Sequence, residues 1–119
     1  MTGSECQATQ AAALEVEAAL EAYETHVRRL VHTWLDMDLY RHVSAEIDEI
    51  RSFCMLLPEL SIPWVALLVS HAELVHCLWR SDQPGQRVTQ RDLQSRLEDH
   101  VQCIRRLAES SRRLADPRS

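Results

Sequence analysis

The stretch SIPWVALLVSHAELVHCLWR, residues 61–80, decides the fold. On a helical wheel its apolar side chains cover an arc of roughly 200°, and its polar side chains share the narrow remainder: Ser70, Glu73, His76 and Arg80. A helix that packs one side against a bundle core needs an apolar arc of only a little over 100°. The excess predicts a helix that is central in the fold or that buries a second face against another chain.

Helical periods also occur on both sides of this stretch. Apolar stripes at 100° per residue run through residues 16–34, 39–57 and 93–114. The chain has only two glycines and four prolines, so it offers few places to turn. These patterns predict an all-α protein, a four-helix antiparallel bundle that forms a dimer. The single domain covers residues 1–119, with helices at about 7–35, 38–57, 62–80 and 89–115.

Several polar residues predict where the helices begin. Asp36 and Asp38 can both act as N-caps, so we expect the first two helices to be separated there. Ser61 can cap the third helix in the same way. Thr89 and Asp92 resemble a capping box, with aspartate in place of the usual glutamate, at the start of the fourth helix.

The charge pattern weighs against nucleic-acid binding. The chain has a net charge of −5, and all 13 of its basic side chains are arginines. Residues 1–50 hold ten acids and three arginines, whereas the remainder holds eight acids and ten arginines. A nucleic-acid-binding protein of this size would carry a basic patch and a positive net charge. We therefore expect a protein partner, with the acidic half directed toward a basic rim.

The sequence favours a cytoplasmic protein that binds no cofactor. Its first residues lack the basic and apolar regions of a signal peptide. Residues 61–80 are interrupted by His71, Glu73 and His76, so we do not expect a membrane span. The cysteines are far apart and form no Cys-x-x-Cys pair, which favours free, packed thiols. No phosphate-binding loop, nucleophile elbow or His-Glu-x-x-His motif is present, so we expect no enzyme activity.

The wide apolar arc predicts the residues of a partner or dimer interface. Tryptophan combines a large apolar area with a polar N–H group and is enriched at interface centres. The predicted interface residues are Trp64, Leu67, Leu68, His71, Val75, Leu78 and Trp79. Because His71 lies in the middle of this arc, we expect a neutral imidazole that is hydrogen-bonded to a neighbour.

A metal-binding bundle is the alternative. His42 and Glu46 are four residues apart on a predicted helix and could share a ligand face. This His-x-x-x-Glu step resembles the ligand pattern of hemerythrin-type di-iron proteins, although no His-x-x-x-His step follows it. The resemblance covers only these two residues and implies a di-iron site. The candidate ligands of a metal-binding bundle are His26, His42, Glu46, His71 and His100.

The length, the helical pattern and the acidic and apolar surface of the whole chain resemble a family of regulators. These are the small helical anti-activators (QslA-type) that act in bacterial quorum sensing. The resemblance implies a homodimer that binds a LuxR-type transcription regulator and covers that regulator's apolar dimerisation surface.

Overall fold

The computed structural model describes residues 3–33, 36–85 and 87–116. They form four α-helices and one short 3₁₀ turn, and no strand occurs in these ranges, which confirms the all-α prediction. The elements are α1 (Gly3–His32), α2 (Met37–Cys54), η1 (Pro58–Leu60), α3 (Ser61–Ser81) and α4 (Gln90–Ala115). Trp34, which the sequence assigns to the first apolar stripe, lies outside the described residues.

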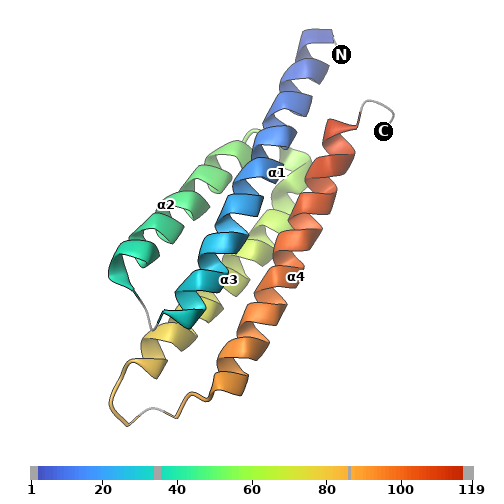
Figure 1. The fold of residues 1–119 in the computed structure, drawn as a ribbon. Helices are drawn as coiled ribbons and strands as arrows, with labels where there is room; N and C mark the ends of the chain where they lie inside the picture. The colour runs from blue at the N-terminus through green and yellow to red at the C-terminus, as the bar shows by residue number, and fades with distance from the viewer. Residues whose placement is uncertain (1–2, 34–35, 86, 117–119) are drawn as a thin grey trace.

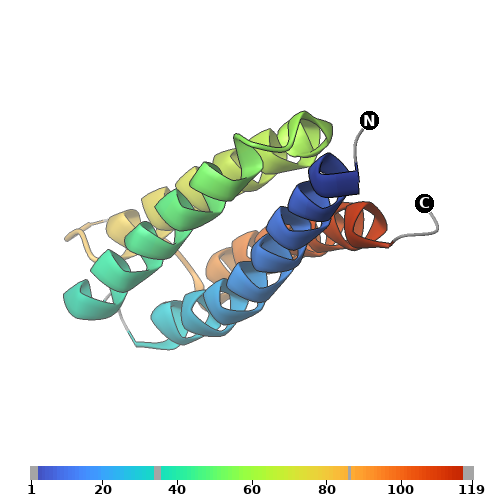
Figure 2. The ribbon, with the colours of Figure 1, turned by 90° about the horizontal axis from the view of Figure 1, so that it is seen from above.

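The helices form an elongated bundle of 58 × 24 × 18 Å (Figures 1 and 2). α1 packs extensively against α4, α3 packs against α4, and α2 packs against α1. α2 and α3 contact each other much less. The start of α1 and the end of α4 lie at the same end of the bundle (Figure 1). The third helix is therefore covered mainly by α4, which leaves part of its surface without a neighbouring helix.

Two of the three N-terminal caps that the sequence predicts are present in the structure. The Asp36 side chain accepts hydrogen bonds from the backbone N–H groups of Asp38 and Leu39, as expected of an N-cap. Thr89 and Asp92 form the predicted capping box at the start of α4.

The predicted cap at Ser61 is wrong. Ser61 is already helical, because η1 leads directly into α3, and its Oγ donates to the Pro58 carbonyl. In the connection after α3, Gly85 has a φ of 79°, a conformation that glycine adopts without strain. α1 also begins earlier than the sequence predicts, at Gly3.

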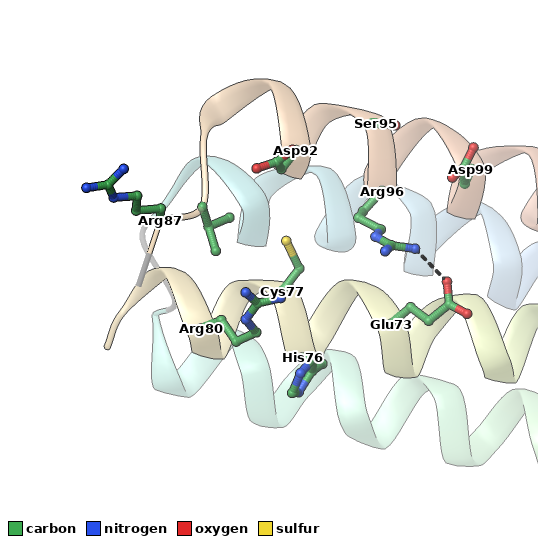
Figure 3. Close-up of a pocket in the computed structure, with 10 residues that line it drawn as sticks. Glu73, His76, Cys77, Arg80, Arg87, Asp92, Ser95, Arg96 and Asp99 are labelled. Atoms are coloured by element: carbon green, nitrogen blue, oxygen red, sulfur yellow. Dashed lines mark hydrogen bonds and ion pairs between the residues drawn. The ribbon is translucent and has the colours of Figure 1, made fainter. Parts of the chain in front are cut away.

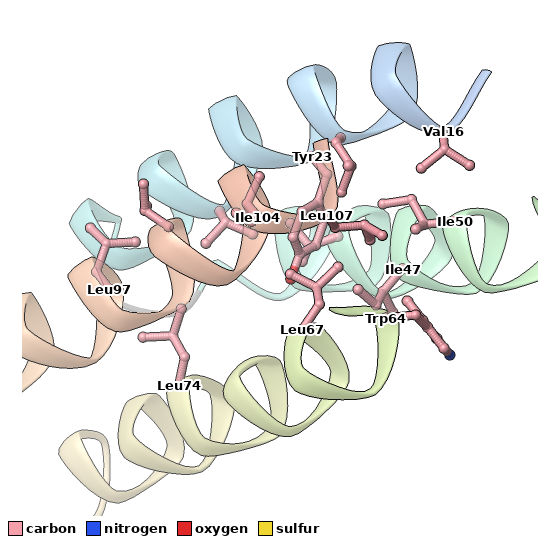
Figure 4. Packing of buried hydrophobic residues seen from close by; sticks show 14 of the residues in the cluster. Val16, Tyr23, Ile47, Ile50, Trp64, Leu67, Leu74, Leu97, Ile104 and Leu107 are labelled. Atoms are coloured by element: carbon pink, nitrogen blue, oxygen red, sulfur yellow. The ribbon is translucent and has the colours of Figure 1, made fainter. Parts of the chain in front are cut away.

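One apolar core runs along the bundle (Figure 4). Its larger members come from every helix, and they include Leu20, Tyr23, Ile50, Leu67, Leu74, Leu97, Ile104 and Leu107. Tyr23 and His100 bring polar groups into this core, and no buried side-chain nitrogen or oxygen of the described residues lacks a hydrogen-bond partner. The polar groups are thus accommodated by specific pairing.

Candidate functional site

One side of α3 is apolar and faces away from the core. Ile62, Val65, Leu68 and Val69 are between 41% and 83% exposed, and their spacing places them on one strip of the helix. We call these four residues the apolar face. No Asp, Glu or Arg occurs from Leu60 to Ala72, so this part of the helix carries no formal charge at neutral pH apart from any on His71. A contiguous apolar surface of this kind marks an interaction site more often than scattered exposed leucines do.

Two neighbouring segments define the limits of this surface. Met55 and Leu56, in the turn after α2, are also exposed and extend the apolar character at the start of α3. Toward the end of α3 the exposed strip becomes polar, with Glu73, His76 and Arg80. The apolar face therefore occupies only the first half of the helix.

The structure divides the residues that the sequence predicts for an interface. Trp64, Leu67 and Leu78 are buried in the core and are not accessible to a partner. Val75 and Trp79 are partly buried, and the Trp79 ring packs edge-on against Tyr40 with centroids 5.8 Å apart. His71 is partly buried and hydrogen-bonded inside the bundle, which leaves Leu68 on the apolar face. Of the seven predicted residues, only Leu68 therefore belongs to the apolar face.

The predicted interface did not include three residues of the apolar face, Ile62, Val65 and Val69. A helical wheel alone does not show which part of a wide apolar arc faces the core. The prediction centred the interface on His71, whereas the middle of the arc packs into the bundle and one flank is exposed. A usable signal was present: these three residues adjoin the polar side of the wheel, where exposure to solvent is greatest.

Tyr23 lies at the centre of a buried polar cluster. Its hydroxyl is 2.5 Å from Nδ1 of His71 and 2.6 Å from Nε2 of His100. Ser70 Oγ lies 2.6 Å from Nδ1 of His100 and 3.0 Å from the Leu67 carbonyl oxygen. The cluster joins α1, α3 and α4 through side chains in the bundle interior. The predicted hydrogen bond of His71 is confirmed, and its partner is Tyr23.

The number of available protons fixes the direction of these hydrogen bonds. The Leu67 carbonyl can only accept, so the single Ser70 hydroxyl proton is donated to it. His100 then donates from Nδ1 to Ser70, and its Nε2 accepts from the Tyr23 hydroxyl. The Tyr23 oxygen in turn accepts from Nδ1 of His71. In this arrangement both imidazoles are neutral and every group uses its one proton.

The pKa values agree with a neutral cluster. Burial and, to a smaller extent, the neighbouring His71 together lower the pKa of His100 from 6.5 to about 3. Burial also lowers the pKa of His71, although Asp48 partly opposes this effect. Burial and the nearby Glu46 raise the pKa of Tyr23 well above its ordinary value. Proton uptake by either histidine would remove an acceptor or create a buried charge.

Acidification should therefore destabilise the protein below pH 6.5. A histidine that is neutral when folded takes up a proton on unfolding, so its stabilising effect is complete above 6.5 and is lost progressively as the pH falls toward about 3. His100 alone should lower the free energy of unfolding by about 2 kcal/mol between pH 7 and pH 5. Urea unfolding at the two pH values measures this change. His76→Gln, which replaces an exposed imidazole, is the control and should lose as much stability between pH 7 and pH 5 as the native chain. A free energy of unfolding that does not change with pH would contradict the neutral, buried cluster.

A second histidine cluster lies between α1 and α2. His26 Nδ1 is 2.9 and 3.0 Å from the two carboxylate oxygens of Glu46. His42 Nε2 is 3.8 Å from Glu46 Oε1, and the two imidazole rings are perpendicular with centroids 4.6 Å apart. The potential ligand atoms of the three residues all lie within 4.8 Å of one another.

The five predicted metal ligands thus form two sites. His26, His42 and Glu46 converge, as the His-x-x-x-Glu spacing suggested for two of them. His71 and His100 instead bond to Tyr23, and the ring nitrogens that face it are occupied. A di-iron centre that draws on all five residues is therefore inconsistent with the structure.

A groove of about 490 Å³ lies between α3 and α4 near their connection (Figure 3). The residues that line it include Arg80, Arg87 and Arg96, and also Glu73, Asp92 and Asp99. Arg96 donates to Glu73 at 2.9 Å, and hydrogen bonds from Thr89 lower the pKa of Asp92. Burial raises the pKa of the Cys77 thiol, which disfavours the reactive thiolate. The groove is balanced in charge and contains no activated nucleophile among these residues.

Comparison of the chain with protein-family models, with curated proteins and with solved structures gives no match. By length and composition, residues Pro58–Ser81 are apolar enough to cross a membrane, and 22% of the most apolar part is buried in the bundle. The site must therefore be interpreted from its own chemistry.

Proposed function

We propose that the protein is a non-catalytic protein-interaction module, an antiparallel four-helix bundle that pairs with a second copy of itself through the apolar face of α3. The observation that supports this most is the exposure of Ile62, Val65, Leu68 and Val69 on one side of a helix that packs chiefly against a single other helix, α4. Burying these side chains removes apolar surface from water, which is the main favourable term in association.

A second copy suits the charge of this surface. Two chains that each carry −5 repel one another at most orientations. The segment from Leu60 to Ala72 has no acidic or arginine side chain, so two copies can meet there without placing like charges in contact. In a two-fold pair both chains contribute the same patch, which doubles the apolar area that is buried. Glu73, His76 and Arg80 then lie at the polar rim.

The polar end of the exposed strip favours a protein partner over a lipid bilayer. Glu73 lies well inside the helix and would have to enter the hydrocarbon region if α3 crossed a membrane. Charged side chains at the centre of a bilayer are costly. In a protein interface they remain in water at the rim.

The regulatory role that we propose is the exchange of this second copy for another protein. The resemblance to helical anti-activators supports a transcription regulator of the LuxR type as that partner. A regulator that dimerises through an apolar surface presents the same chemistry as the α3 face. Binding by this chain would cover that surface and leave the regulator unable to pair.

Val65→Glu should abolish self-association with little effect on folding. Val65 is 54% exposed in the single chain, so a carboxylate there stays solvated when the chain is alone. In a two-fold pair it places two unpaired charges in an apolar contact, which should weaken association about 100-fold or more. Sedimentation velocity measures the change. The control Ala45→Glu adds the same charge to an exposed position of α2 and should pair normally.

The same variants test the regulatory role. Mixed with the purified ligand-binding domain of a LuxR-type regulator, the native chain should convert the regulator dimer into a mixed complex, and Val65→Glu should leave the dimer intact. Equal association of native chain, Val65→Glu and Ala45→Glu would rule out the apolar face as the binding surface. If the native chain self-associates but the regulator dimer persists, only the proposed exchange of the second copy for the regulator would be ruled out.

A further inference from the structure

We propose that His26, His42 and Glu46 form a binding site for one divalent transition-metal ion, such as Zn²⁺, that bridges α1 and α2. Two imidazole nitrogens and one carboxylate oxygen form a ligand set that zinc and its neighbours in the first transition row accept readily. Imidazole is a poor ligand for Mg²⁺ and Ca²⁺, which prefer oxygen. The site is independent of the apolar face.

The distances suit such an ion after small side-chain adjustments. With ligand bonds of about 2.0–2.1 Å, the donor atoms of a tetrahedral zinc site are about 3.4 Å apart. The His26–Glu46 distance of 2.9 Å and the His42–Glu46 distance of 3.8 Å lie on either side of this value. His42 and Glu46 are one helical turn apart on α2, and α1 supplies His26 from the adjacent helix. The backbone therefore already holds the ligands in range.

The surroundings of Glu46 are the second observation that supports a cation. Its side chain is only 13% exposed, yet the ion pairs of the described residues join it to His26 and His42 and to no arginine. In a chain with 13 arginines, a largely buried carboxylate would ordinarily be paired with one of them. An ion held by Glu46 and both imidazoles would supply the missing positive charge.

The site would hold the metal with three protein ligands and leave a further position open. The His42 side chain is 56% exposed, so water can reach the ion and complete its coordination. Protons and the metal ion compete for the same imidazole nitrogens, so metal affinity should fall as the pH is lowered. The ion would fasten the α1–α2 hairpin, which is joined to the rest of the bundle chiefly through α1.

Titration of the untagged, chelator-treated protein with Zn²⁺ tests this site. Calorimetry should show one ion bound per chain, and Mg²⁺ should show no binding. Zinc at about 100 times its dissociation constant should raise the Tm by on the order of 10 °C, because it binds only the folded state. His42→Ala, at an exposed position where folding should survive, should lower zinc affinity at least ten-fold and, at the same zinc concentration, reduce the rise in Tm by about half or more.

His76→Ala is the matched control, because it deletes an exposed histidine on α3 that lies outside the cluster. It should bind zinc as the native chain does. Absence of zinc binding to the native chain would overturn the proposal. Zinc binding that is unchanged in His42→Ala, or that is lost when Cys6 and Cys103 are replaced by serine, would also overturn it, since the ion would then occupy other ligands.

Discussion

Tyr23→Phe is expected to lower the free energy of unfolding by about 2–4 kcal/mol, although it removes a single oxygen atom. The Tyr23 hydroxyl bonds both His71 and His100 in the bundle interior. Without it, the Nδ1–H of His71 and the acceptor Nε2 of His100 lose their partner in a region that water does not reach freely. Each buried group left unsatisfied costs about 1–3 kcal/mol, whereas the change in packing volume is small.

Tyr40→Phe is the matched control for this effect. Tyr40 is partly buried and packs edge-on against Trp79, and no described residue forms a hydrogen bond with its hydroxyl. Its loss should change stability by less than about 0.5 kcal/mol, as expected of a position away from a buried network. Urea unfolding of both variants at neutral pH makes the comparison. Equal effects of the two substitutions would show that the cluster contributes no specific stability.

Leu67→Ala should destabilise the fold by about 2–5 kcal/mol, the cost of a cavity in a packed core. Leu67 is fully buried, whereas its neighbour Leu68 is 41% exposed on the apolar face. Leu68→Ala should change folding by less than about 1 kcal/mol, yet it should weaken self-association by roughly 1–3 kcal/mol. The two substitutions delete the same atoms one residue apart, so composition cannot account for a difference.

Denaturant unfolding, at concentrations where the chain is monomeric, gives the effect of Leu67→Ala and of Leu68→Ala on the free energy of unfolding alone. Sedimentation of the same two variants at higher concentration gives the association term. If Leu68→Ala lost much of its folding stability while its association was unchanged, Leu68 would belong to the core. The assignment of this side of α3 to the apolar face would then be wrong.

The sequence predicts the helices of this protein well because their signals are local. Apolar residues at helical spacing and the caps at Asp36 and Thr89 depend on neighbours a few positions away. The cap at Ser61 failed for a reason that is also local, since a 3₁₀ turn extends the helical path upstream of it. Ser61 therefore already lies inside the helical segment and does not occupy the N-cap position.

The orientation of α3 could not be predicted, because it depends on contacts between distant segments. Leu67 and Leu68 have the same side chain, so composition cannot distinguish them. The packing of α3, chiefly against α4, buries Leu67 and leaves Leu68 exposed. The pairing of Tyr23 with His71 and His100 spans 48 and 77 positions of the chain, so no spacing rule could find it. The four-residue spacing of His42 and Glu46 was visible in the sequence. The approach of His26 to them depends on the packing of α1 against α2, which the sequence does not show.

The molar mass of the native chain as a function of concentration tests the central claim, that the apolar face of α3 pairs with a second copy. Multi-angle light scattering in lipid-free buffer should give about twice the chain mass of 13.7 kDa at micromolar concentration, and this value should fall toward 13.7 kDa on dilution. A mass of 13.7 kDa at every concentration, or an association that requires lipid vesicles, would contradict the account.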